Sequence, residues 1–507
     1  MIRITKTENG TVKGIPCADP RITAFKGVPF AKPPVGKLRW RAPQPAENWD
    51  GVRECFEFAP ISVQDTPGIG DDIYCREWHV DPDVPMSEDC LYLNIWTNAK
   101  SADERLPVLV WYFGGGFQWG YTSEMEFDGE RLARRGVVVV TVNYRLGAFG
   151  FIAHPEMTAE DPEKPCNFGS LDQQAGLFWV RRNIATFGGD PENITIAGQS
   201  AGGGSVLAQM ASKQNEGSFQ KACVFSGMFQ SPYIPNNFFC PRTLSEAEKL
   251  GEQLFAELGV ETLDEARKLD ADFIRSTYSD MRNKTGVMFT IANDGHFCTG
   301  DPLKAFCNGT RNRVPVFAGN TGDEFLECIP AADDEGYHAK AREIFGEKAD
   351  EFLSLAPKGV TPMGYAPASP CEIGVKVAFR SENKLPDPRP CYYYRFVPDI
   401  PGDDHPGTFH SCDLWFFFDT IAKCSRPYTG RHYDIARQMC DYWVNFIKNG
   451  DPNGRDICGE ELPEWERYTG KGGAEMTFTP EGAVPAVESD PLTMFLIDRA
   501  IEREDKS

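Results

Sequence analysis

The chain has 507 residues, and its apolar (41%) and charged (25%) fractions exclude a disordered protein, a collagen-like repeat and a small disulfide scaffold. Its 74 acidic and 52 basic side chains give a net charge of −22, which excludes a general nucleic-acid binder, because such a protein needs basic surface to neutralise phosphates. From this charge we expect no nucleic-acid partner. No apolar run approaches the roughly 18 residues of a membrane span, so we also expect no membrane span.

The first residues predict a small hairpin. Ile2 to Thr7 has the pattern of a strand, Asn9-Gly10 is typical of a tight hairpin turn, and a returning strand is expected from Thr11. No apolar stretch of signal-peptide length is present, so we expect a cytoplasmic protein, or an exported one if a leader has been removed. The sixteen cysteines fit the first alternative as reduced, buried thiols, because none forms a C-x-x-C pair.

Strands and helices alternate in the next part of the chain. Residues 106–113 and 137–144 are continuous apolar runs, as expected of strands that are buried on both faces of a mainly parallel sheet. Residues 171–187 change to helical spacing and have apolar side chains on more than one side, which predicts a buried helix. A strand at 194–199 leads directly into a helix from Ser200, and the class is therefore α/β.

The stretch from about 231 to 300 differs from what precedes it. Its periodicity is helical, with charged segments at 243–258 and 263–274 that we predict to be helices. We interpret it as a helical insertion that covers the end of the sheet where active sites of open α/β folds lie. Its aromatic side chains, with Met288, are expected either to line an acyl pocket or to form a core of their own; they are Phe238, Phe239 and Phe289.

The rest of the chain continues the α/β pattern. The predicted strands are 222–226, 314–320 and 391–396, and the predicted helices are 434–448 and 491–504. Length alone favours about three domains at roughly 150 residues each. Because no repeat, low-complexity linker or clean boundary is present, we predict one extended domain over residues 1–507.

The chain contains one G-x-S-x-G pattern, at residues 198–202, with Ser200 at its centre. A nucleophile elbow needs this arrangement, because a strand runs into the motif and a helix leaves it, so that the serine hydroxyl projects above the sheet. The alternative is a glycine-rich helix start in which Ser200 only caps the helix.

A run of three glycines, residues 114–116, follows the first strong strand. Without side chains, backbone amides can point into a cavity, so Gly115 and Gly116, together with the amide of Ala201, are candidates for an oxyanion hole. Taken alone, the run is also consistent with a flexible turn. The elbow and the glycines together, in this order, favour a hydrolase.

At this point the sequence resembles the carboxylesterase type B family, the cholinesterase and carboxylesterase branch of the α/β-hydrolases. The segment 187–203 is similar to the family's elbow region almost residue for residue, and 87–95 resembles its second signature. Residues 25–36 and 142–151 are further family-like stretches. The resemblance implies an α/β-hydrolase fold with a central, mostly parallel sheet flanked by helices.

The resemblance also implies a catalytic triad in the order serine, acid, histidine. Residues 408–415 resemble the family's histidine loop, which makes His410 the general base, and the nearby His405 is interpreted as a solvated loop residue. In the segment 319–325, Glu324 matches the family's acid, although Asp323 is its neighbour. Ser226 resembles a serine that supports the acid by a hydrogen bond, or is simply a serine at the end of a strand.

Three further features follow from the resemblance. Arg39 and Glu88 correspond to a buried ion pair. Cys90 corresponds to a disulfide cysteine whose usual partner lies further upstream than Cys75, so we do not expect this disulfide here. Val80 stands where cholinesterases carry a tryptophan that attracts a quaternary ammonium, and we therefore expect no preference for choline esters.

The predicted function is hydrolysis of small to medium, neutral or aromatic carboxylic esters, through an acyl-enzyme intermediate on Ser200. The partner is a small-molecule ester, and the chemistry requires no metal and no organic cofactor. One alternative is a catalytically inactive binding or adhesion protein of the same fold. The other is an amidase or acyltransferase that uses the same triad. The sequence leaves the oligomeric state open.

Overall fold

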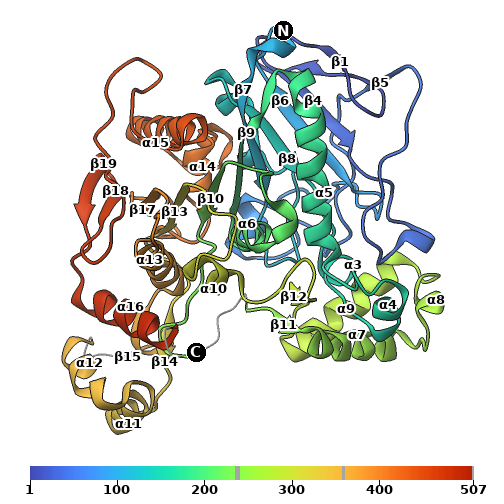
Figure 1. The fold of residues 1–507 in the computed structure, drawn as a ribbon. Coiled ribbons are helices and arrows are strands. Elements are labelled where there is room, and N and C mark those ends of the chain that lie inside the picture. Colours follow the sequence, from blue (N-terminus) through green and yellow to red (C-terminus); the bar gives the residue numbers. More distant parts are fainter. Residues whose placement is uncertain (235–239, 357–359, 505–507) are drawn as a thin grey trace.

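An eleven-stranded sheet forms the centre of the computed structural model, which describes residues 1–234, 240–356 and 360–504 (Figure 1). The strand order is β19-β18-β17-β13-β10-β9-β7-β8-β6-β4-β3. Neighbouring strands from β8 to β18 pair in parallel, whereas the pairs that involve β6, β4 and β3 at one edge and β19 at the other are antiparallel. This is the α/β-hydrolase architecture predicted above.

The strands of the central sheet have the following bounds: β3 (Ile15–Pro16), β4 (Thr23–Pro29), β6 (Tyr92–Thr97), β7 (Leu106–Tyr112), β8 (Val138–Val142), β9 (Gly189–Gln199), β10 (Lys221–Phe225), β13 (Val316–Thr321), β17 (Cys391–Phe396), β18 (Ala474–Thr479) and β19 (Gly482–Val487). Smaller sheets are formed by β1 (Ile4–Lys6), β2 (Thr11–Lys13) and β5 (Val52–Glu54), by β11 (Arg242–Thr243) and β12 (Ala292–Asn293), and by β14 (Glu327–Ile329), β15 (Val360–Thr361) and β16 (Gly364–Ala368).

The α-helices have the following bounds: α1 (Ile73–Glu77), α2 (Glu130–Arg134), α3 (Gly147–Gly150), α4 (Pro155–Glu160), α5 (Phe168–Asn183), α6 (Ala201–Ala211), α7 (Leu244–Leu258), α8 (Leu263–Ala266), α9 (Ala271–Thr285), α10 (Pro302–Cys307), α11 (Asp334–Phe345), α12 (Ala349–Leu355), α13 (Pro370–Glu382), α14 (Leu414–Phe417), α15 (Gly430–Asn449) and α16 (Pro491–Glu504).

Strand β7 shows how the sheet separates two apolar cores. Its side chains alternate between the faces, so Val108 and Val110 join the core under α5, α6 and α13. Leu109 and Trp111 join the core on the other face, which contains the aromatic side chains of α14 and α15. A strand covered on both sides has to be apolar at every position, which explains the uninterrupted run in the sequence.

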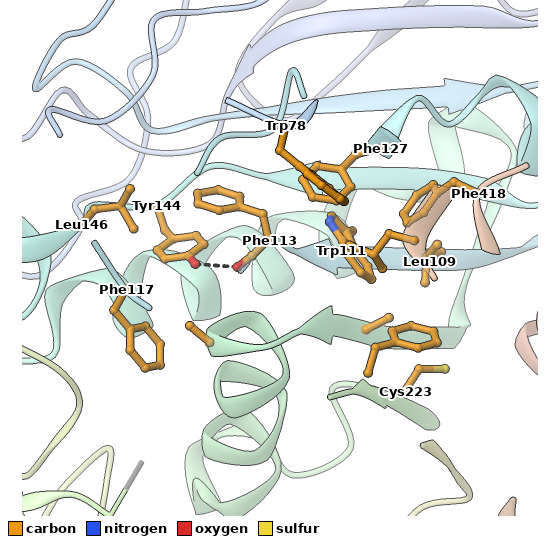
Figure 2. Close-up of a cluster of buried hydrophobic side chains, with 14 of the residues drawn as sticks. Trp78, Leu109, Trp111, Phe113, Phe117, Phe127, Tyr144, Leu146, Cys223 and Phe418 are labelled. Carbon is orange, nitrogen blue, oxygen red and sulfur yellow. Dashed lines mark hydrogen bonds between the residues drawn. The ribbon is translucent and has the colours of Figure 1, made fainter. Parts of the chain in front are cut away.

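Figure 2 shows how the second core anchors the backbone just before the glycine run. The ring of Phe113 stacks on that of Tyr144, with 4.3 Å between the ring centroids. The Tyr144 hydroxyl donates a hydrogen bond of 2.7 Å to the carbonyl oxygen of Phe113. This bond joins the chain after β8 to the end of β7 and therefore fixes the point at which residues 114–116 leave the sheet.

Most of the predicted elements lie where the sequence placed them. The hairpin of β1 and β2, the strands β7, β8, β9, β10, β13 and β17, and the helices α5, α6, α7, α15 and α16 are confirmed. The helical periodicity over 263–274 belongs to two helices, because the chain forms α8, breaks, and starts again as α9. Asp270 causes the second start, since its side chain accepts hydrogen bonds from the backbone of Asp272 and Phe273 and so caps α9.

The region from 231 to 300 contributes helices α7, α8 and α9, which lie together in one corner of the molecule (Figure 1). Tyr278 of α9 donates a hydrogen bond of 2.6 Å to Gln118, close to the glycine run. Phe289 stacks on Tyr278 and belongs to the core. Phe238 and Phe239, also considered for the acyl pocket, lie outside the described residues.

Two expectations drawn from the resemblance concern side-chain pairs. Arg39 and Glu88 form the buried ion pair, with both hydrogen bonds at 2.6 Å. All sixteen cysteines are free thiols, Cys75 and Cys90 included.

In the described part of the chain, no helix is long and apolar enough to cross a bilayer.

Candidate active site

Ser200 lies between β9 and α6, at the carboxyl edge of the parallel strands. Its backbone is strained, with φ 55° and ψ −123°, a conformation that residues with side chains rarely adopt. The two glycines of the motif permit this sharp turn, because a Cβ on Gly202 would lie 2.1 Å from the carbonyl oxygen of Tyr112, and one on Gly198 would lie 2.3 Å from that of Gly202. The sequence pattern is therefore a packing requirement of the elbow.

The glycine run curls over Ser200 with backbone angles that favour glycine. Gly115 and Gly116 have φ values of 100° and 62°, and a Cβ on Gly115 would lie 2.2 Å from the carbonyl oxygen of Trp119. Ala201 is the first residue of α6, so its N–H has no partner within the helix. Gly115, Gly116 and Ser200 all line one cavity.

His410 is paired with Glu324. The distance between His410 Nδ1 and Glu324 Oε2 is 2.6 Å, and the exposed fractions of the two side chains are 5% and 0%. Burial by itself raises the pKa of Glu324, but the neighbouring His410 and the hydrogen bonds to the carboxylate outweigh it and hold the pKa below its usual value. Glu324 is therefore an anion at neutral pH, suited to orient an imidazole.

Asp323 faces away from His410 and has a different contact. Its Oδ2 atom accepts hydrogen bonds from the backbone N–H and the hydroxyl of Thr408, at 2.7 and 2.8 Å. Of the two adjacent carboxylates, Glu324 contacts the histidine, and Asp323 holds the loop that carries it. His405, also considered in the sequence, is exposed.

The second nitrogen of His410 has an unexpected neighbour. Nε2 lies 3.1 Å from the side-chain amide nitrogen of Gln199, the residue before Ser200. Within the described residues, Ser200 Oγ makes no hydrogen bond to His410. With the Nδ1 proton directed at Glu324, Nε2 carries the lone pair and accepts from the amide, so the tautomer is the one that a general base requires.

Three contacts around the acid and the base were not foreseen. Gln199 was visible in the motif, but nothing in its position predicted a contact with His410. The Thr321 hydroxyl donates to Glu324 Oε1 at 3.0 Å, and the thiol of Cys371 lies 3.6 Å from Oε2. Ser226 contributes to lowering the pKa of Glu324, although its buried Oγ makes no hydrogen bond of normal length and angle with any described residue.

The cavity above Ser200 has a volume of about 520 Å³. Its walls are mostly apolar and aromatic, and they include Trp78, Trp119, Phe127, Met288, Phe325 and Leu414. Val80 is exposed and does not line it, whereas Trp78, two residues earlier, does. Phe325 lies over His410, with 4.5 Å between the ring centroids.

Two acidic groups in the cavity wall have basic partners. Asp65 lies 2.6 Å from Arg282, and Glu124 lies 3.1 Å from His79. Their charges are therefore largely compensated within the protein. The cavity can accommodate an uncharged organic molecule next to a serine, a histidine and a carboxylate.

Comparison with known proteins points to one family. The profile of the carboxylesterase family matches residues 2–356 and 375–492. Fumonisin B1 esterase of Sphingopyxis macrogoltabida is 32% identical over 89% of this chain and 82% of its own length. Para-nitrobenzyl esterase of Bacillus subtilis (strain 168) is 31% identical over 92% of both chains.

Solved structures whose names identify them as esterases superpose on nearly the whole chain. A structure named PNB esterase superposes with a TM-score of 0.76 at 28% identity, covering 99% of this chain and all of the other. A carboxylesterase of Geobacillus stearothermophilus gives a TM-score of 0.77 at 28% identity, covering 98% of this chain and all of the other.

Proposed function

The chain belongs to the carboxylesterase family, and we propose that it hydrolyses small to medium, neutral or aromatic esters with Ser200, His410 and Glu324 as its catalytic triad. It is a serine esterase, as its relatives are, and the alternative of an inactive binding protein is set aside. The observation that carries the assignment of residues is the 2.6 Å contact of the buried Glu324 with His410, which lines the same cavity as Ser200.

The first half of the reaction transfers the acyl group to the enzyme. His410 Nε2 exchanges its contact with Gln199 for the hydroxyl of Ser200 and accepts the hydroxyl proton as Oγ attacks the ester carbonyl. Glu324 stabilises the imidazolium that forms. The negative charge on the carbonyl oxygen is met by the amides of Gly115, Gly116 and Ala201, and each such donor typically lowers the barrier by about 3 kcal/mol.

The second half releases the acid. His410 passes its proton to the leaving alcohol, which departs into the cavity. A water molecule then takes the place of the alcohol, loses a proton to His410 and attacks the acyl-enzyme, and the proton returns to Ser200 Oγ. The side chains named here account for every proton in the cycle.

The lining of the cavity supports the proposed substrate class. Trp119 and Phe325 keep aromatic surface exposed toward the cavity, and two of the acidic groups in the wall, Asp65 and Glu124, already have basic partners. A benzyl ester should therefore be hydrolysed with a higher kcat/KM than the ethyl ester of the same acid. Parallel assays with the matching amide, and with an added alcohol as acyl acceptor, distinguish an esterase from an amidase or an acyltransferase.

Covalent labelling tests the nucleophile. A fluorophosphonate probe followed by peptide mass spectrometry should place one label on Ser200, and Ser200→Ala should abolish both labelling and ester hydrolysis. Ser411 lines the same cavity and provides the matched control, because Ser411→Ala should still be labelled at Ser200. A label on Ser411, or on any other residue of the active wild-type enzyme, would overturn the assignment.

A further inference from the structure

The side chains of Glu324, Cys371 and His410 itself converge on the Nδ1 side of the imidazole, and they differ in ligand chemistry. Glu324 Oε2 lies 2.6 Å from His410 Nδ1 and 3.6 Å from Cys371 Sγ, and the three ligand atoms all lie within 4.8 Å of one another. Carboxylate, imidazole and thiolate are the groups that bind Zn²⁺ in proteins. We propose that Glu324, His410 and Cys371 bind Zn²⁺ and that the bound ion inhibits the esterase reversibly.

The distances suit a tetrahedral ion. With metal–ligand bonds of about 2.0 Å to oxygen and nitrogen and about 2.3 Å to sulfur, the ligand atoms of a zinc site lie roughly 3.3 to 3.6 Å apart. The separation of Glu324 Oε2 and Cys371 Sγ, 3.6 Å, already lies in this range. The separation of Oε2 and His410 Nδ1 has to widen by about 0.7 Å, which a small rotation of the imidazole provides.

Charge balance favours the dication at this buried position. When Zn²⁺ binds, the Cys371 thiol loses its proton to solvent, so that one thiolate and one carboxylate face one dication beside a neutral imidazole. The resulting cluster has no net charge. An electroneutral cluster costs far less to bury than an isolated ion, which matters because Cys371 is completely buried.

A fourth donor lies next to Glu324. Ser226 lies beside Glu324, and its buried Oγ has no hydrogen-bond partner among the described residues. A buried hydroxyl without a partner is unusual in a folded protein. Its lone pairs are therefore available to complete the coordination of the ion.

The inhibition follows from the proposed role of His410 as the general base, on which this inference rests. A neutral imidazole has one proton and one lone pair. If Zn²⁺ occupies the lone pair of Nδ1, the single proton resides on Nε2, which then cannot accept the proton of Ser200. The ion also takes the place of the hydrogen bond that orients the ring.

The experiment measures initial rates of ester hydrolysis at increasing Zn²⁺, each variant relative to its own metal-free rate. Wild type should be inhibited, and a chelator should restore the activity. Cys371→Ser should need at least about tenfold more Zn²⁺ for the same inhibition. Cys371→Ala replaces this variant if the serine variant fails to fold. Mg²⁺ and Ca²⁺ should have no effect, because they prefer oxygen ligands.

Cys75 provides the matched control. Its thiol lies 3.2 Å from Asp72 Oδ2 at the wall of the same cavity, so it is the competing place for an ion to bind. Cys75→Ser should be inhibited like wild type. Retained zinc sensitivity in Cys371→Ser, or its loss in Cys75→Ser, would overturn the proposal.

Metal binding can also be measured by a method that does not depend on ester hydrolysis. Co²⁺ substitutes for Zn²⁺, and a sulfur-to-cobalt charge-transfer absorption should form in wild type and be missing in Cys371→Ser. Absence of this absorption in wild type would overturn the metal site and leave the proposed function standing. Binding without inhibition would overturn the inhibitory role and would count against His410 as the base.

Discussion

His410 Nε2 lies 3.1 Å from the side-chain amide of Gln199, the residue that precedes Ser200. In the proposed mechanism this nitrogen accepts the proton of Ser200, and in the structure it contacts the residue next to that serine. Both side chains are almost completely buried. The proposed mechanism therefore requires a rearrangement in which Nε2 exchanges the amide for the Ser200 hydroxyl. A substitution at Gln199 should accordingly change how readily His410 takes up a proton in the proposed reaction.

Gln199→Glu should move the acid limb of the pH profile. A carboxylate beside Nε2 stabilises the protonated imidazole, so kcat/KM should begin to fall at a pH about one unit higher than in wild type. The measurement is kcat/KM for a p-nitrophenyl ester across the pH range. Gln214→Glu, on the exposed surface, adds the same charge at a distance and should leave the profile unchanged. Identical profiles for wild type and Gln199→Glu would contradict the contact.

Glu324→Gln should reduce kcat by about 10³- to 10⁴-fold, because an amide neither stabilises the imidazolium nor holds the required tautomer. Asp323→Asn should cost far less, since an amide oxygen can still accept a hydrogen bond from Thr408. The measurement is kcat of both variants, from steady-state kinetics, relative to wild type. The opposite order of losses would transfer the role of the acid to Asp323.

Choline esters should not be preferred over neutral esters of the same acid. Trp78 lines the cavity, but its ring is packed against those of Tyr74, Phe409 and Trp415, with centroids 5.5 to 5.9 Å apart, and is only 3% exposed. Little of its face is left for a cation. The comparison is kcat/KM for butyrylcholine against an uncharged isostere. A preference of more than about tenfold that Trp78→Ala abolishes would refute this expectation.

Asp413→Asn should stabilise the protein in a pH-dependent manner. Burial raises the pKa of Asp413 from 3.8 to about 7, although the Tyr394 hydroxyl donates to it. Between pH 4 and 7 the unfolded carboxyl ionises while the folded one keeps its proton, so wild type loses stability as the pH rises, by about 4 kcal/mol above pH 7. Urea unfolding should show the variant gaining stability at pH 8 and little at pH 4; an equal gain at both would exclude this cause.

Asp172→Asn should destabilise the fold by about 3–5 kcal/mol. The Asp172 carboxylate accepts two hydrogen bonds of 2.7 Å from the Arg145 guanidinium, and both side chains are buried, so the variant leaves an uncompensated charge in the interior. The exposed pair of Lys13 and Glu54 is the control, and Glu54→Gln should cost less than about 1 kcal/mol. The free energies come from urea unfolding at neutral pH.

The sequence by itself determined the architecture and the position of the elbow that carries Ser200, the proposed nucleophile. These features depend on short-range patterns: continuous apolar runs predict β7 and β8, helical spacing predicts α5, and the glycines around Ser200 permit a turn that other residues would obstruct. Each pattern lies within one element or at one junction. The break between α8 and α9 was missed because Asp270 acts as a cap only after the chain has turned there.

Only the tertiary structure decided which side chains surround His410. Glu324 and Asp323 are adjacent in the sequence, yet their side chains contact different partners. Only the resemblance to the family favoured Glu324, because no physical property of the segment distinguishes the two carboxylates. Nor does a local pattern predict the contacts of Gln199 and Cys371, which come from different elements and meet at His410 and Glu324. Such contacts depend on how the sheet brings strand ends and loops together, because the direction of a side chain is set by the packing of the whole fold and not by its neighbours along the chain.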